Sequence, residues 1–428
     1  MKLKFNKMIK EVNIFHLFLF LAILVIIFNY KKIYIRSLFL IYDIYSLGGN
    51  MWKLKPECCS VMTNNFYTDV SPELYSEFNN LIYNRIETGD NTINRDKVKV
   101  VCNKMLKELQ ENKIEYKKPK QIRIIDLNTE YNAKEKIREY IKNDIPFVIR
   151  NLDLEVFKLN FNDLSESIGE EKVLFTPSLP NCPKGYIGKF NEISTNNCYL
   201  PNVTSIFNKN EEILKETDVD KLKELSGGVM DTKSLFVGRQ KGTGTPLHSA
   251  FTNNFFINVD GEKTWNFFNP NNTPLLYPFF SESGVYNASD SRFLNHKVSN
   301  VDKFPLIKYA DYFEYTIKPG EILYNPSSWW HSVYNETQST IAISTRWSFP
   351  WNFMHNRDLG MIRCANLRNK NLRDLAEKLY VEYNIMGINV IDEHNVLGNG
   401  NDEIPVWDKI VTENYLLCAD KDCSKQWH

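Results

Sequence analysis

Two short segments each place one histidine in a sequence pattern typical of β-structure. Thr-Pro-Leu-His-Ser-Ala contains His248, and Asn-Pro-Ser-Ser-Trp-Trp-His ends at His331. Neutral imidazoles are common ligands of iron, which two histidines and one carboxylate hold in many oxygenases. The residue two positions after His248 is Ala250, which offers no ligand. We therefore predict a metal site on His248 and His331, with its third ligand open.

A predicted β-hairpin follows the first histidine. Residues 251–259 and 263–268 are rich in aromatic and β-branched residues, and Asp260-Gly261 between them is typical of a two-residue turn. In that register Asn258 faces Lys263. Because side chains alternate along a strand, His248, Ala250, Asn254 and Asn258 share one face with Lys263. By strict alternation the side chain of Thr245 would point to the opposite face. Pro246 interrupts the strand between them, however, and resets the alternation.

The surrounding sequence predicts a mainly β protein with flanking helices. Residues 234–350 contain short aromatic and β-branched runs separated by turn residues, as a barrel or sandwich requires. Further strands are expected at 122–127 and 146–150, and helices at 133–142 and about 162–168, from the period of their apolar residues.

These motifs resemble the JmjC/cupin-like group of Fe(II)- and 2-oxoglutarate-dependent oxygenases, and most closely its asparaginyl-hydroxylase-like branch. The resemblance covers residues 121–350 and is most specific in Pro-Gly-Glu-Ile-Leu-Tyr-Asn-Pro, which begins at Pro319 and precedes His331. It implies a double-stranded β-helix, also called a cupin or jelly-roll barrel. The departure from the family pattern is His-x-Ala in place of His-x-Asp or His-x-Glu.

The resemblance implies an Fe(II) site, a 2-oxoglutarate site and a protein side chain as the hydroxylated substrate. In this interpretation His248 and His331 hold the metal. Around 2-oxoglutarate lie Thr245, Asn254, Lys263 and Thr345, with Lys263 pairing with the far carboxylate. Water, Asp260, Glu262 or His296 remain open as the third metal ligand. The resemblance to this family also suggests a homodimer contact through the predicted C-terminal helices.

Three alternatives stay open beside the active dioxygenase. The first is a catalytically inactive cupin-like binding module. The second is a halogenase, because Ala250 leaves room for chloride at the iron. The third, a demethylase, has no supporting feature in this sequence. Turnover of 2-oxoglutarate separates the dioxygenase from the binding module, and product mass in chloride tests the halogenase.

Composition and the N-terminal segment indicate the size of the core, the kind of partner and the cellular location. The chain has 428 residues, is 43% hydrophobic and 13% aromatic, and so can bury a large core. Its 52 basic and 52 acidic residues balance, which argues against a nucleic-acid partner.

The uncharged, apolar run at residues 12–28 predicts a transmembrane signal anchor. The flanking lysines favour a type II single-pass membrane protein whose body lies in the endoplasmic reticulum or Golgi lumen.

These observations divide the chain into five predicted parts. They are a cytoplasmic N-terminus at 1–11, the transmembrane anchor at 12–30, a helical stem at 31–120, the JmjC/cupin-like domain at 121–350 and a helical extension at 351–428.

Overall fold

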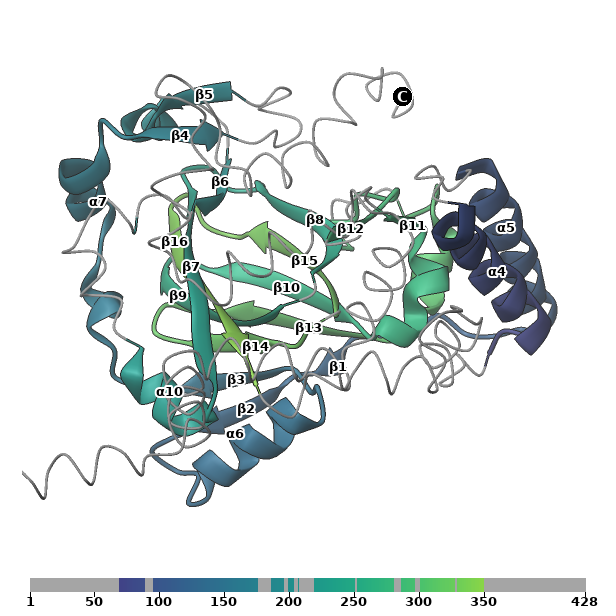
Figure 1. Ribbon diagram of the computed structural model, residues 1–428, viewed down its shortest axis with the longest axis horizontal. Coiled ribbons are helices and arrows are strands. Elements are labelled where there is room, and N and C mark those ends of the chain that lie inside the picture. The colour runs from purple at the N-terminus through teal and green to yellow at the C-terminus, as the bar shows by residue number, and fades with distance from the viewer. Residues whose placement is uncertain are drawn as a thin grey trace, which may run out of the picture. The chain divides into compact units, whose positions relative to one another are not determined.

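The computed structural model describes residues 69–88, 95–175, 186–195, 199–203, 207, 219–250, 252–280, 286–296, 301–327 and 329–349. All of them belong to the compact unit formed by residues 59–428. Two sheets of seven strands dominate this unit (Figure 1).

The first sheet runs in the order β1 (Lys120–Gln121), β13 (Tyr312–Ile317), β10 (Lys263–Phe268), β15 (Trp330–Asn335), β8 (Gly244–Ala250), β12 (Tyr286–Ser289) and β11 (Pro278–Phe280). The second runs in the order β2 (Arg123–Asp126), β3 (Phe147–Arg150), β14 (Ile322–Asn325), β9 (Asn253–Asp260), β16 (Thr340–Ser348), β7 (Val229–Gly238) and β6 (Tyr199–Val203). A separate pair joins β4 (Lys172–Phe175) to β5 (Tyr186–Lys189).

The two sheets face each other across an aromatic core. Phe256 of the second sheet packs edge to face on Trp265 of the first, with ring centroids 4.8 Å apart. Trp265 stacks in turn on Phe267, and Leu323 and Val333 join the same buried cluster. Because this cluster draws on both sheets, it defines the interior of the barrel. The predicted mainly β, cupin-like architecture is confirmed.

Helices cover the outer face of each sheet. Against the second sheet pack α6 (Ala133–Lys142), η1 (Glu155–Lys158), α7 (Phe161–Ile168), η2 (Phe190–Ser194) and α10 (Asp220–Ser226). Against the first pack α4 (Pro72–Thr88), α5 (Arg95–Glu111), η3 (Pro270–Leu276) and η4 (Pro305–Tyr309). Ile137 and Ile141, one turn apart on α6, are fully buried, which explains why this amphipathic segment folds as a helix.

The predicted β-hairpin at Asp260-Gly261 is wrong. β9 pairs with β14 and β16, whereas β10 pairs with β13 and β15, so the two strands lie in opposite sheets. Gly261 adopts a φ of 71°, but Asp260 continues β9 opposite Ile341. The turn therefore crosses the sandwich. The inward-facing side chains of β9 and β10 still lie close together, because the inner faces of both sheets pack against the same core.

The predicted parity reset at Pro246 is confirmed. On β8 and β15, His248 pairs with His331 and Thr245 pairs with Val333. Two residues of β8, Pro246 and Leu247, thus oppose the single residue Ser332, which is a β-bulge. The extra residue brings Thr245 to the same face as His248.

The membrane part of the predicted fold class and localisation is corrected. In the part of the chain that the structure describes, no helix is both long and apolar enough to cross a membrane. The longest, α4 and α5, have 17 residues each, or about 26 Å, and both carry charged residues throughout. The predicted transmembrane helix at residues 12–30, on which the type II lumenal localisation depended, lies outside the described residues, as does the helical extension at 351–428.

Candidate functional site

The barrel interior holds a directly opposed pair of histidines. His248 on β8 and His331 on β15 face each other in register, with ring centroids 4.1 Å apart. Both are buried, at 8% and 3% exposure. Trp265 stacks almost parallel on His331 at 5.4 Å between centroids and fixes the orientation of that ring. The structure thus brings together two residues that lie far apart in the sequence.

Both histidine rings make a hydrogen bond from Nδ1 to a backbone carbonyl. The Nδ1 atom of His248 lies 2.9 Å from the carbonyl oxygen of Pro246, and that of His331 lies 2.9 Å from the carbonyl oxygen of Trp329. A carbonyl oxygen only accepts, so each Nδ1 carries the proton and donates it. A proton on Nδ1 is the usual tautomer of a histidine that binds metal through Nε2. Here the Nε2 of His331 lies 3.3 Å from Asn325 Nδ2, and His248 also has a hydrogen bond with the backbone of His331.

The charge state and spacing of the pair also fit a divalent metal. Burial lowers the pKa of His248 to about 4 and that of His331 well below its ordinary value, and the nearby Arg346 charge lowers both further. Both rings are therefore neutral at pH 7. Two imidazoles bound at right angles to one metal through Nε2 have centroids about 4.6 Å apart, close to the spacing of this pair.

The third ligand position has no acid. Ala250 occupies it, and the described residues contain no group of three histidine, cysteine or acidic side chains that could hold a metal ion. The proposed replacements lie elsewhere. Asp260 accepts a hydrogen bond from Ser339 at the end of β9. His296 packs between Phe293 and Tyr312, which belong to the core on the outer face of the first sheet.

Lys263 is fully buried on the same inner face as the histidine pair. Its Nζ donates to Asn335 Oδ1 at 2.6 Å and to Thr340 Oγ1 at 2.9 Å, and it lies 5.5 Å from the centre of the Tyr199 ring. None of these partners is charged. Burial therefore lowers the pKa of Lys263 to about 7, and the more distant Asp260 only partly opposes this effect. A buried cation among neutral partners is a ready site for an anion.

The other predicted cosubstrate residues divide between two faces. Thr245 reaches the interior through the bulge opposite Val333. Asn254 lies opposite Asn325 and accepts a hydrogen bond from Ser344 inside the barrel. Thr345 does not join them, because its hydroxyl donates to the carbonyl oxygen of Phe255 and accepts from Trp347 Nε1 in the outer core.

Sequence reasoning missed three polar residues that the structure places in or beside this interior. Asn325 lies against His331, Arg346 acts electrostatically on both histidines, and Asn335 holds Lys263. Asn325 was expected in a loop but ends β14, and Arg346 follows Ser344 by two residues on β16. Alternation from the inward-facing Leu323 and Ala342 would have identified both as inward-facing.

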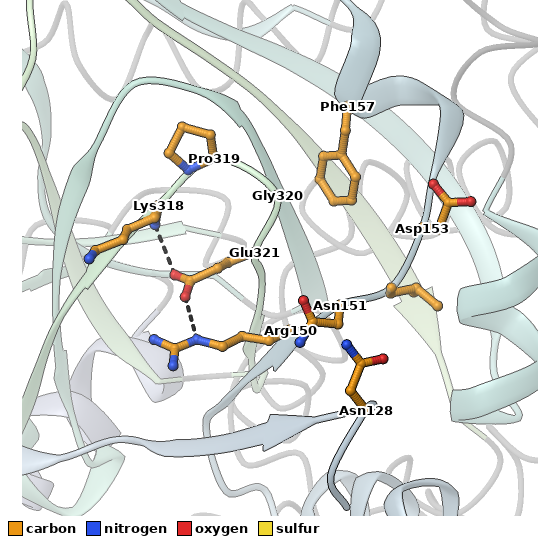
Figure 2. Close-up of a pocket in the computed structure, with 10 residues that line it drawn as sticks. Asn128, Arg150, Asn151, Asp153, Phe157, Lys318, Pro319, Gly320 and Glu321 are labelled. Atoms are coloured by element: carbon orange, nitrogen blue, oxygen red, sulfur yellow. Dashed lines mark hydrogen bonds and ion pairs between the residues drawn. The ribbon is translucent and has the colours of Figure 1, made fainter.

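A pocket of about 540 Å³ lies elsewhere, between the β13–β14 turn and the segment that follows β3 (Figure 2). Arg150 donates to Glu321 at 2.6 Å beside it and also to the hydroxyl of Tyr315. These contacts join the two sheets at this end of the barrel. None of the predicted site residues lines the pocket, and two of its charged groups, Arg150 and Glu321, pair with each other.

Comparison with known proteins agrees with this architecture. Residues 184–350 match the family described as cupin-like domain. JmjC domain-containing protein D of Dictyostelium discoideum is 40% identical over 23% of this chain and 21% of its own length. Arginine-specific demethylase JMJ20 of Arabidopsis thaliana is 33% identical over 30% of this chain and 26% of its own, and human HSPB1-associated protein 1 is 31% identical over 26% and 22%.

The aligned region thus spans about a quarter of the length of these relatives. The histidine pair and the buried lysine lie within residues 184–350, and the resemblance predicted from the sequence is confirmed. Proteins of this group generally depend on Fe(II) and 2-oxoglutarate. Residues 184–350 thus match a cupin-like domain, and about a quarter of the chain is similar to JmjC-related proteins.

Proposed function

We propose that this domain binds Fe(II) through His248 and His331, binds 2-oxoglutarate on Lys263, and oxidises a protein side chain. One observation carries the proposal. A fully buried lysine with neutral partners and a pair of neutral histidines face the same closed interior. Either feature alone occurs in ordinary protein cores, but together they place a candidate anion site and a candidate metal site on the same inner face of the barrel.

The register between β10 and β15 sets the separation of these two sites. Lys263 pairs with Asn335, and Phe267, four residues along β10, pairs with His331. Four residues of antiparallel strand span about 14 Å between backbone positions. The ammonium of Lys263 is held by Asn335 and Thr340, and in this proposal a short dicarboxylate bridges the distance from there to the histidines. One carboxylate would then neutralise Lys263 while the other end of the molecule reaches the histidines.

Each residue has a separate role in this arrangement. The Nδ1–H donors to Pro246 and Trp329 fix both rings, and Asn335 and Thr340 hold the lysine ammonium. Bound Fe(II) and 2-oxoglutarate together supply the activation of dioxygen for attack on a C–H bond. The aromatic walls, including Trp265 and Phe256, exclude bulk water from the interior.

The names of the relatives support a protein side chain as substrate. One is called an arginine-specific demethylase and another a lysine-specific demethylase. Hydroxylation of a carbon and removal of a methyl group from nitrogen both begin with oxidation of a C–H bond. We therefore propose oxidation of a C–H bond in a protein side chain as the reaction class.

A second function, a non-catalytic binding module, is favoured by Ala250, which removes the acid expected beside His248. Conversion of 2-oxoglutarate to succinate by the full-length protein separates the two. We expect Fe(II)-dependent conversion that His248→Ala abolishes. His296→Ala is the matched control, because it removes a histidine on the outer face of the first sheet and should leave turnover unchanged. Absence of succinate, with 2-oxoglutarate still bound, would support the binding module instead.

A further inference from the structure

Residues 291–296, which we call the outer-face segment, cross the outer face of the first sheet behind the histidine pair. Phe293 in this segment is fully buried and packs edge to face on Phe268 of β10, with ring centroids 5.6 Å apart. The backbone N–H of Phe293 donates to the hydroxyl of Ser291 at 3.2 Å. The segment is therefore held both by its own hydrogen bonds and by packing on the sheet.

Two consecutive carbonyl groups of the segment accept hydrogen bonds from three neighbouring strands. The carbonyl oxygen of Phe293 accepts from the backbone N–H of Leu247 on β8 at 2.8 Å. The carbonyl oxygen of Leu294 accepts from Ser332 Oγ on β15 at 2.7 Å and from Asn266 Nδ2 on β10 at 3.2 Å. These contacts bind the segment across the three strands that lie side by side at the histidine pair.

One peptide group connects this segment to His248. The carbonyl oxygen of Pro246 accepts from Nδ1 of His248 at 2.9 Å, and the N–H of the same peptide group, which belongs to Leu247, donates to Phe293. The carbonyl and the N–H of a trans peptide point in nearly opposite directions, and the group between them is rigid and planar. The peptide therefore links the ring on the inner face to the segment on the outer face.

The β-bulge makes this link possible. Pro246 and Leu247 together oppose Ser332, so their peptide group lies outside the regular ladder between β8 and β15. The outer-face segment supplies the partner that the ladder lacks. Ser332 and Asn266 reach the same segment because each alternates with an inward-facing neighbour, and their side chains point outward.

We propose that the outer-face segment is a positioning element for the metal site. Through the Pro246–Leu247 peptide group it holds the ring of His248 in the orientation and tautomer that a metal shared with His331 requires. The consequence for metal binding rests on the proposed function, whereas the consequence for the ring does not. No residue of the segment is a ligand in this proposal. Hydrogen-bond partners behind the ligands of a metal commonly change its affinity tenfold or more.

A double variant, Ser332→Ala with Asn266→Leu, tests the proposal because it removes both side-chain donors to Leu294 while leaving the histidines in place. In the metal-free, full-length protein, nitrogen-15 NMR of the imidazoles measures how fast the Nδ1 proton of His248 exchanges with water, and His248→Ala identifies the signal. We expect slow exchange in the unaltered protein and exchange at least roughly tenfold faster in the double variant.

Co(II) binding to the same proteins measures the effect on the metal site without requiring catalysis. Titration gives the affinity, and the absorption bands of bound Co(II) report the geometry of its ligands. The double variant should bind Co(II) roughly three- to tenfold more weakly and with shifted bands. Ser332→Ala alone removes the shorter of the two bonds and should show the same changes at smaller size, so it keeps the test open if the double variant does not fold.

Thr264→Val is the matched control. Thr264 lies on the same face of β10 as Asn266, and its hydroxyl donates to Glu336 Oε1 at 2.6 Å, away from the outer-face segment. The variant removes a comparable buried hydrogen bond and should lower the unfolding temperature, but it should change neither the Nδ1 exchange of His248 nor the Co(II) spectrum. Equal effects of Thr264→Val and the double variant on that exchange would overturn the proposal.

The two measurements separate this inference from the proposed function. Unchanged Nδ1 exchange in the double variant would show that the segment does not position His248, even if Co(II) still binds to the histidines. If the unaltered protein binds no Co(II), the metal part of the proposed function fails. Faster exchange in the double variant would then still establish that the segment positions the ring.

Discussion

The ammonium of Lys263 donates to the amide oxygen of Asn335 at 2.6 Å, and this neutral group is its shortest contact. The two residues face each other across β10 and β15 and are both fully buried. A lysine in such a place destabilises the protein unless something compensates its charge. The pairing therefore links the stability of the fold to the ligand that the domain binds.

Replacing this lysine should stabilise the protein and abolish its anion site. Lys263→Met keeps most of the side-chain length and removes the buried charge, so we expect the free energy of unfolding without ligand to rise by about 1 kcal/mol or more. Binding of 2-oxoglutarate, measured by calorimetry, should fall below detection. Lys107→Met, on an exposed lysine of α5, should change neither quantity. A less stable Lys263→Met would contradict the argument.

Binding of 2-oxoglutarate should weaken as the pH rises above 7. The pKa of Lys263 without ligand is about 7, whereas an adjacent carboxylate would hold the lysine protonated. Binding above pH 7 must therefore take up one proton, and affinity should fall roughly tenfold per pH unit, to about a hundredfold by pH 9. His248, with a pKa of about 4, stays neutral over this range.

Calorimetry in buffers of different ionisation enthalpy measures that proton uptake directly. Lys263→Arg keeps its charge over the whole range, so any binding that it retains should be independent of pH. Binding by the unaltered protein that stays constant from pH 6 to pH 9 would show that Lys263 is not the anchor.

Local patterns predicted individual elements well. The helix at 133–142 and the strand at 263–268 have the expected bounds, because each depends on the period of apolar residues within a single segment. The bulge at Pro246 was also predictable, since proline cannot donate a hydrogen bond to a strand ladder. These features depend on residues that are near neighbours in the sequence.

Partner choice between strands was not predictable in the same way. The Asp260-Gly261 turn favours a hairpin locally, but β9 instead lies between β14 and β16, which are more than 60 residues away in the sequence. Burial of Phe256 against Trp265 across the sandwich stabilises this crossing. The same non-local pairing extends β14 through Asn325 and turns Thr345 toward the outer core. Sandwich packing therefore determined the residues that sequence reasoning misplaced or missed.

A methyl group at Gly238 should disturb the two residues that hold the ammonium of Lys263. The Cβ of an alanine there would lie 2.7 Å from Asn335 Nδ2 and 2.8 Å from Thr340 Oγ1, the two residues that hold Lys263. We expect Gly238→Ala to cost roughly 1–3 kcal/mol of stability and to weaken 2-oxoglutarate binding. Gly320→Ala is the comparison, because it strains a positive φ in open space and should cost stability without affecting binding.

Metal and 2-oxoglutarate should each strengthen the binding of the other. Arg346 lies close enough to lower the pKa of both histidines, so its charge also opposes a metal ion bound there. An anionic ligand relieves that repulsion, and the coupling must be reciprocal. Saturating 2-oxoglutarate should therefore raise Co(II) affinity roughly tenfold. In Arg346→Met, Co(II) alone should bind more tightly and gain less from 2-oxoglutarate. Equal gains in both proteins would exclude Arg346 as the source.

A carboxylate at position 250 should complete the metal site. Ala250 follows His248 by two residues on β8, so alternation directs its side chain to the same face. We expect Ala250→Asp to raise Co(II) affinity by roughly 10- to 100-fold and to increase conversion of 2-oxoglutarate to succinate. Ala250→Asn has nearly the same shape without the charge and should give a smaller gain. Equal affinities in the two variants would show that the carboxylate does not reach the metal.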